Sequence, residues 1–170
     1  MRRMVILGNS GCGKSRLARM LGARLGLPVV HLDPLYYGAG WVHGDAATFR
    51  RRVTEALAGD AWIVDGAFLS LVGDITLPRA EHVIWLEQPR WRALARALAR
   101  CIDPRQAARA DLPAGCRDTP SREMLADIWS FEREGRPDLE RRLATLAPAT
   151  SIQRLRGDRA VAAFVQSIAG

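Results

Sequence analysis

The most specific chemical pattern in the sequence lies close to the N-terminus. Residues 8–15 read Gly-Asn-Ser-Gly-Cys-Gly-Lys-Ser and match the G-x-x-x-x-G-K-[ST] pattern of a Walker A phosphate loop. Glycines let such a loop turn its backbone N–H groups inward to bind anions, while the lysine reaches the terminal phosphates and the hydroxyl binds Mg²⁺. We therefore expect Lys14 to be catalytic and Ser15 to be a magnesium ligand. The predicted nucleotide-binding residues of this segment are Gly8, Asn9, Ser10, Gly11, Cys12, Gly13, Lys14, Ser15 and Arg16.

The basic residues of the chain support this interpretation. Lys14 is the only lysine, and all the other basic residues among the 25 are arginines. A compact ammonium on a flexible stem fits a closed phosphate loop, whereas a planar guanidinium is bulkier and forked. The only basic residue that is not an arginine therefore occupies the position of the phosphate loop that tolerates an arginine side chain least.

Two carboxylates follow predicted strands, at positions where ligand sites form in open α/β sheets. Asp33 follows the apolar run 29–32, and Asp65 ends the apolar run 61–64 in the manner of a Walker B strand. We expect Asp65 to hold the magnesium shell. For Asp33 several roles stay open: general base for an acceptor hydroxyl, substrate ligand, magnesium binding through water, or a turn-forming Asp before Pro34.

An arginine-rich segment follows the fourth predicted strand. Between Arg90 and Arg122 the sequence has eight arginines against three aspartates, and Pro and Gly interrupt its middle. Arg96 and Arg100 are four residues apart and so share one helix face. We predict a mobile lid over roughly 101–120, with Arg96 and Arg100 catalytic through charge stabilisation. The alternative is a helix whose arginines only face solvent.

Alternating apolar runs and helical patterns predict an α/β domain spanning residues 1–170. Strands are predicted at 4–7, 29–32, 61–66, 81–86 and 151–155. Helices are predicted after the phosphate loop and at 45–57, 89–101, 121–135, 138–146 and 158–168, while residues 70–78 give no clear signal. Aromatic residues at 36, 37 and 41 lie on a glycine-rich loop and either close over a substrate or form a local apolar plug.

Composition limits the function classes. No apolar run approaches the roughly 20 residues that span a bilayer, so we expect no membrane partner. An odd count of 3 cysteines without a C-x-x-C pair argues against a disulfide framework or a zinc site and favours a reducing, cytoplasmic location. The net charge of +7 suits a polyanionic ligand, either a nucleotide or a nucleic acid.

The whole chain is similar to the nucleoside monophosphate kinase branch of phosphate-loop proteins, which includes adenylate, shikimate and gluconate kinases. The closest resemblance is to the small proteins labelled topology modulation protein or adenylate-kinase-related. It rests on Gly8–Ser15, 31–33, Trp62–Gly66, 83–86 with 89–91, and 154–156. The resemblance implies a P-loop NTPase fold with three α/β/α layers, a five-stranded parallel sheet of order 2-3-1-4-5 and a helical lid. It also implies ATP and Mg²⁺ as cofactors.

The resemblance adds expectations for individual arginines. Arg96 and Arg100 match the arginine pair that precedes the lid of adenylate kinases, and Arg133 and Arg136 match later arginines less closely. The loop Arg156–Asp158 is expected near the adenine edge of the nucleotide. The chain has Gly-Ala-Phe-Leu at 66–69 where adenylate kinases have Gly-Phe-Pro-Arg, which argues against AMP as the acceptor.

The sequence thus predicts an ATP-dependent phosphotransferase that acts on a small-molecule or nucleotide acceptor. The expected partners are a nucleotide and this acceptor, and the chain is expected to be a monomer or a homodimer. One alternative is an ATP-binding regulator associated with nucleic acid, of the DNA topology modulation type. It is not favoured, because much of the positive charge falls in the predicted lid and no nucleic-acid-binding motif is visible. The other alternative is a simple NTPase.

Overall fold

The computed structural model describes residues 1–102, 112–113, 116–117 and 119–168. Its strands are β1 (Arg3–Gly8), β2 (Val29–His31), β3 (Trp62–Asp65), β4 (His82–Glu87) and β5 (Ser151–Arg156). Its helices are α1 (Lys14–Leu25), α2 (Asp33–Tyr36), η1 (Ala39–Trp41), α3 (Ala46–Ala56), α4 (Leu69–Thr76), α5 (Arg90–Ile102), α6 (Arg122–Ser130), α7 (Gly135–Ala144) and α8 (Gly157–Ser167). None of these helices is long and apolar enough to cross a membrane.

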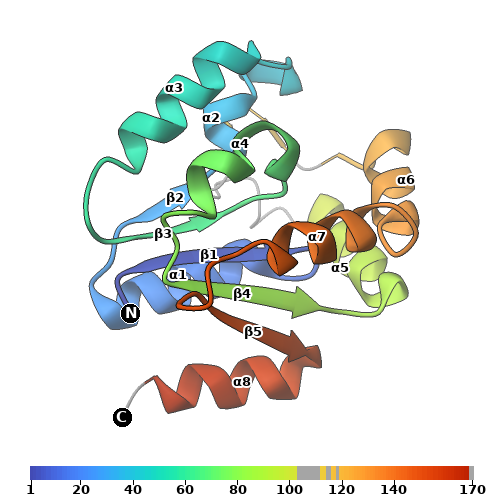
Figure 1. Ribbon diagram of the computed structural model, residues 1–170. Helices are drawn as coiled ribbons and strands as arrows, with labels where there is room; N and C mark the ends of the chain where they lie inside the picture. The colour runs from blue at the N-terminus through green and yellow to red at the C-terminus, as the bar shows by residue number, and fades with distance from the viewer. Residues whose placement is uncertain (103–111, 114–115, 118, 169–170) are drawn as a thin grey trace.

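The five strands form one parallel sheet in the order β2-β3-β1-β4-β5, which confirms the predicted order. Successive side chains of a strand point to opposite faces of the sheet. Val5 and Leu7 of β1 therefore join the core under α3, α4 and α7, while Met4 and Ile6 join the core under α1 and α8. Helices thus cover both faces of the sheet, as three layers (Figure 1).

The elements with strong local signals form as predicted. The chain enters α3 at Asp45, whose carboxylate caps the helix by accepting a hydrogen bond from the Thr48 backbone N–H. It leaves α1 at Gly26, which adopts the left-handed conformation typical of a helix end. Ser121 likewise caps α6 by accepting a hydrogen bond from Met124 N–H.

The structure extends the local predictions at two segments and corrects them at a third. Residues 70–78 gave no clear signal, and most of them belong to α4, because Val72 and Thr76 pack into the core and compensate for Gly73 and β-branched residues. Asp33 begins the short helix α2. The helix predicted from Ser121 to about Gly135 ends at Ser130, and α7 begins at Gly135 with Pro137 in its first turn, where proline is tolerated.

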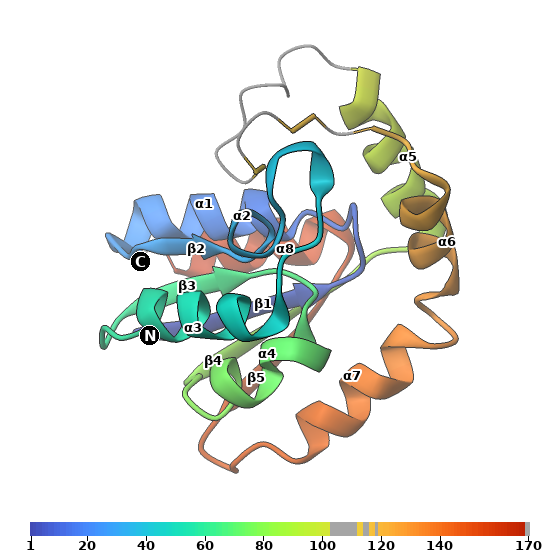
Figure 2. The ribbon, with the colours of Figure 1, turned by 90° about the horizontal axis from the view of Figure 1, so that it is seen from above.

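Helices α5 and α6 lie beyond the carboxyl ends of the strands (Figure 2). Ala93 and Ala97 of α5 and Ile128 of α6 form a small buried cluster of their own between the two helices. This pair of helices therefore stands beside the carboxyl ends of the strands, where the phosphate loop and both predicted carboxylates are located.

Candidate active site

A cleft of about 430 Å³ opens at the carboxyl ends of β1, β2 and β3. The phosphate loop, the residues that follow β2 and β3, and the inner side of α5 supply its walls. The structure brings all six residues predicted for catalysis or metal binding to this one cleft. They are Lys14, Ser15, Asp33, Asp65, Arg96 and Arg100.

The phosphate loop has the backbone conformation that its glycines allow. Gly11 and Gly13 have φ angles of 76° and 103°, in the region that residues with a Cβ rarely adopt. Helix α1 begins directly after Gly13, so the partial positive charge of its N-terminus faces the loop. The Lys14 ammonium donates to the carbonyl oxygens of Gly8 at 2.9 Å and Asn9 at 3.0 Å, which holds it over the loop.

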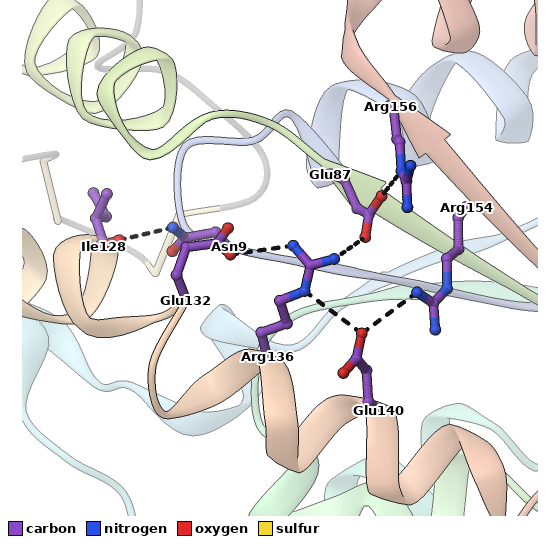
Figure 3. A network of polar contacts seen from close by, with 8 residues as sticks. All are labelled: Asn9, Glu87, Ile128, Glu132, Arg136, Glu140, Arg154 and Arg156. Carbon is purple, nitrogen blue, oxygen red and sulfur yellow. Dashed lines mark hydrogen bonds and ion pairs between the residues drawn. The ribbon is translucent and has the colours of Figure 1, made fainter.

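The two inner residues of the loop have structural contacts that the motif alone does not show. The Asn9 side chain is buried and its Nδ2 donates to the carbonyl oxygen of Ile128 at 2.9 Å, which joins the loop to α6 (Figure 3). The Cys12 side chain is also buried, and burial raises the pKa of its thiol, which disfavours the reactive thiolate. Their predicted nucleotide contacts would therefore come from the backbone.

Asp65 has a partner that sequence reasoning missed. His31 of β2 and Asp65 of β3 are direct neighbours in the sheet register, and His31 Nδ1 forms a short contact with Asp65 Oδ1. The His31 side chain is largely buried with this partner. The contact fixes the orientation of the Asp65 carboxylate, which lines the cleft while its side chain is almost fully buried.

The aromatic residues of the loop 36–41 divide between an apolar cluster and the wall of the cleft. The Tyr36 ring packs at 5.0 Å from Phe49 and 4.8 Å from Phe68, so it belongs to an apolar cluster behind the cleft. Trp41 lines the cleft itself, with a φ of 63° that is unusual for a residue other than glycine. Burial raises the pKa of Tyr37, which lies beside this wall of the cleft, and the negative charge of Asp33 raises it further.

Trp41 is tied across the cleft to the segment that follows α5. Its indole Nε1 donates to the carbonyl oxygen of Arg117 at 2.9 Å, and its backbone N–H donates to Cys116 Sγ at 3.3 Å. The Cys116 thiol donates in turn to the carbonyl oxygen of Gly38 at 3.5 Å. These contacts join two segments that are 75 residues or more apart in the sequence.

Arg96 is held by the Asp158 carboxylate, a pairing that the sequence did not predict. Its Nη2 contacts both Asp158 oxygens, at 2.7 and 2.8 Å, and its Nη1 lies 3.4 Å from the carbonyl oxygen of Cys12. Gln88 Nε2 donates to the same carboxylate at 3.0 Å. Asp158 therefore positions Arg96 beside the phosphate loop. The only feature of the sequence that pointed to a role for Asp158 was its position two residues after β5.

The Asp158 contact predicts a pH dependence of stability. The hydrogen bond from Arg96 lowers the pKa of Asp158, so the contact stabilises the fold above the unfolded-chain pKa of about 4. This stabilisation is lost as the pH falls through the lower folded-state pKa. We expect Asp158→Asn to lower the melting temperature at neutral pH and to reduce its decrease between about pH 5 and pH 3. Thermal unfolding across this range tests the prediction; parallel curves for the two proteins would contradict it.

Arg156 lies outside the cleft that holds the other predicted residues. Its side chain is 73% exposed and its Nε contacts Glu87 Oε2 at 2.5 Å. Arg136 Nη2 contacts the other Glu87 oxygen at 3.1 Å and also pairs with Glu132 and Glu140 (Figure 3). This network joins α7 to the ends of β4 and β5. A nucleotide contact of Arg156 remains a prediction.

Most of the lid predicted over 101–120 lies outside the described residues. The parts that the structure describes include Leu112, which lines the cleft, and Cys116 and Arg117, which contact the Trp41 loop. Within the described residues, no three His, Cys, Asp or Glu side chains gather as a metal cage. A metal in the cleft would therefore take ligands from few side chains and complete its shell with phosphate and water.

Comparisons with known proteins support this architecture. A scan against protein-family models and a search of curated proteins find no match. Shikimate kinase from Acinetobacter baumannii, solved in complex with shikimate, matches with a TM-score of 0.63 at 15% identity, over 99% of this chain and 90% of that one. The chain has the P-loop NTPase fold. TT1252 from Thermus thermophilus matches with a TM-score of 0.56 at 18% identity, over 98% of this chain and 95% of that one.

Proposed function

We propose that the protein is an ATP-dependent phosphotransferase that moves the γ-phosphoryl group of ATP to a small-molecule acceptor. The observation that carries this proposal is the single cleft shared by the phosphate loop, two carboxylates and two arginines of α5. The kinase-type fold of the structural neighbours supports it. A protein that only binds nucleotide does not need Asp33 or Arg100 at the same cavity.

The nucleotide side of the cleft fits a triphosphate with magnesium. Backbone N–H groups of the loop and the N-terminus of α1 would hold the phosphates, with Lys14 on the terminal ones. Ser15 and Asp65 supply a hydroxyl and a carboxylate oxygen, which are ligands that Mg²⁺ prefers, and it commonly takes only one or two carboxylates. When bound, the metal would neutralise phosphate charge. His31 would keep the Asp65 carboxylate oriented toward it.

The acceptor side of the cleft includes Asp33 and Trp41. The Asp33 carboxylate would accept the proton of an acceptor hydroxyl as that oxygen forms its bond to the γ-phosphorus and the bond to the departing ADP oxygen breaks. Arg96 and Arg100 would stabilise the negative charge that spreads over the transferring group. Trp41 and its contacts with Cys116 and Arg117 would limit water access, so that transfer to the acceptor exceeds hydrolysis.

A screen for ADP release tests the proposed function. The purified protein with ATP and Mg²⁺ is tested against hydroxylated acids, sugars, nucleosides and nucleoside monophosphates. Phosphotransferase activity predicts that one class raises ADP release at least tenfold and that a phosphorylated acceptor appears by mass spectrometry. ADP release that no acceptor changes would indicate a simple NTPase instead. Salt-sensitive binding to duplex DNA without transfer would indicate a nucleic-acid-associated regulator.

The proposed role of Asp33 predicts that its substitution lowers kcat while the affinity for ATP stays nearly the same. Asp33→Asn keeps the size of the side chain but removes the base, so we expect kcat to fall about 100-fold or more. The dissociation constant of ATP should stay within about threefold, because nucleotide contacts come from the phosphate loop. Steady-state kinetics with the best acceptor from the screen and calorimetry with ATP measure the two quantities. Asp60→Asn, at an exposed position before β3, is the control. Unchanged kcat in Asp33→Asn would exclude general-base catalysis by this residue.

A further inference from the structure

A second cavity lies next to the cleft that holds Lys14 and Asp33. Its volume is about 590 Å³, which is within the size range of small-molecule sites. The end of β1, the start of the phosphate loop, the residues after β3, α4 and the segment from α6 to α7 surround it. The two cavities share Ser10, Gly66 and Ala67 in their walls. A molecule bound at the Asp33 cleft can therefore extend past Gly66 into the second cavity.

The charged and hydroxyl side chains around the second cavity are acids and serines. They belong to Ser10, Ser70, Asp127, Ser130, Glu134 and Asp138. None of the described residues that line it is a lysine, arginine or histidine, although the chain has 25 lysines and arginines and a net charge of +7. In contrast, Lys14 and four arginines line the neighbouring cleft. We call the second cavity the acidic cavity.

Two of its three carboxylates have no cation as a partner in the described part of the chain. Asp138 pairs with Arg141 at 3.1 Å and with Arg142 at 2.7 Å. Asp127 and Glu134 are exposed and form no ion pair with a described residue. Like charges that line one space repel one another, and a cation between them relieves this repulsion. The described acids do not gather as a metal cage, so an organic cation fits this space better than a metal ion.

Asn9 adds an unpaired hydrogen-bond acceptor to the wall of the acidic cavity. The residue is only 5% exposed, and its Nδ2 donates to the carbonyl oxygen of Ile128 at 2.9 Å, which fixes the orientation of the amide (Figure 3). Its Oδ1 has no partner among the described residues, and it is not sealed inside the protein. This oxygen is therefore available to the cavity that Asn9 lines, and it requires an N–H or O–H donor.

The acidic cavity is close to the predicted catalytic base. Burial raises the pKa of Tyr37, the Asp33 carboxylate raises it further, and the Asp127 carboxylate also contributes. Asp127 of α6 and Asp33 of α2 therefore act on the same ring. One molecule can thus present a hydroxyl to Asp33 and a second group to Asp127.

We propose that the acidic cavity binds the positively charged part of the phosphoryl acceptor, which is a hydroxylated amine of the amino sugar or amino cyclitol type. This inference rests on the proposed function and names its substrate class. Asp127 and Glu134 would bind the ammonium group, and Asn9 Oδ1 would accept a hydrogen bond from an amine or a hydroxyl. Phe131 would contact the carbon skeleton. An acceptor hydroxyl would lose its proton to Asp33 as its oxygen bonds to the γ-phosphorus of ATP and ADP leaves.

The same lining disfavours an anionic acceptor. A carboxylate or phosphate group in the acidic cavity would lie beside Asp127 and Glu134 without a lysine, arginine or histidine among the described residues to bind it. The cations that could bind such a group line the neighbouring cleft, where the phosphates of the nucleotide need them. We therefore expect the protein to select acceptors by their positive charge.

Calorimetry with sugars that differ in charge tests the proposal without turnover. The protein with ADP and Mg²⁺ is titrated with glucosamine and 2-deoxystreptamine as amines, with glucose and N-acetylglucosamine as neutral compounds, and with glucuronate as an anion. At least one amine should bind about tenfold more tightly than the uncharged and anionic sugars, and added salt should weaken its binding. Equal or tighter binding of the neutral or anionic sugars would overturn the proposal. So would the absence of amine binding up to about 10 mM.

A double variant tests whether the two unpaired acids bind the amine. Asp127→Asn combined with Glu134→Gln removes both charges with little change in size. We expect the dissociation constant of the amine to rise about tenfold, because each exposed ion pair contributes only modestly. Glu55→Gln combined with Asp60→Asn is the control, since it removes two exposed acids that line neither cavity. Equal losses in the two double variants, or no loss in the first, would overturn the proposal.

Turnover distinguishes a failure of this inference from a failure of the proposed function. An amine that raises ADP release and gains a phosphoryl group by mass spectrometry would support both. Transfer to a sugar acid or a nucleoside monophosphate, without transfer to an amine, would overturn the inference and support the proposed function. Amine binding that the Asp127 and Glu134 double variant weakens, without transfer to any acceptor, would overturn the proposed function and support the acidic cavity as a site for organic cations.

Discussion

Replacing Lys14 with alanine is expected to abolish phosphoryl transfer. The ammonium is the only cation of the phosphate loop itself, residues 8–15. Loss of charge stabilisation on a transferring phosphoryl group costs about 10³-fold or more in rate. We expect kcat with ATP and the best acceptor to fall by at least this factor. ATP binding should also weaken, which calorimetry measures.

A matched variant separates this effect from damage to the fold. Lys14→Ala removes two hydrogen bonds to the backbone of Gly8 and Asn9. Arg24→Ala removes a cation and a 2.7 Å hydrogen bond to Val165 from the other end of the same helix, outside the cleft of Lys14 and Asp33. Both variants should melt within a few degrees of the original chain, and only the first should lose activity. Full turnover by Lys14→Ala would exclude the proposed chemistry.

The second large effect is expected at Gly11, where the phosphate loop meets α5. A Cβ on Gly11 would lie 2.2 Å from the carbonyl oxygen of Ala93, and the φ of 76° would be strained as well. Ala93 is fully buried, so α5 cannot move aside without opening its contact with α6. We expect Gly11→Ala to destabilise the fold by about 2–5 kcal/mol, from strain and steric overlap together. Nucleotide binding should be lost at the same time.

Gly26→Ala is a control that measures the cost of backbone strain alone, without steric overlap. Its φ is 64°, close to that of Gly11, but a Cβ there would meet no atom within 4 Å. Gly26→Ala should therefore cost only the strain of a left-handed residue, about 1–2 kcal/mol. Urea unfolding of both variants gives the difference. Equal destabilisation of the two variants would show that the contact between the loop and Ala93 has no energetic weight.

Much of the fold and part of the site could be predicted because their signals are local. The phosphate loop, Asp33 and Asp65 each follow an apolar run, and a parallel sheet brings the ends of such runs to one edge. Helix α4 was missed, because Gly73 and β-branched residues weaken its local pattern and packing compensates for them. The strand order followed from the resemblance to a family rather than from the periodicity of the residues.

The partners of the site residues could not be predicted, because each contact joins distant parts of the chain. His31 and Asp65 are 34 residues apart, and Arg96 and Asp158 are 62 apart. Register and helix orientation decide such pairs, and neither is encoded in the type or spacing of neighbouring residues. For the same reason the contact of Arg156 with Glu87 could not be predicted, while the nucleotide contact that the resemblance implies for Arg156 stays a prediction.

The central position of β1 has a consequence for the order of folding. This strand pairs only with β3 and β4, so its neighbours in the sheet are synthesised about 60 to 80 residues after it. Contacts so distant in sequence form slowly, because a long loop must close before they contribute any stability. The phosphate loop leaves the ribosome before β3, β4 and α5, yet its support is complete only once α5 has followed. A nucleotide that binds this loop would therefore not assist the early stages of folding, because its site would form late in the nascent chain.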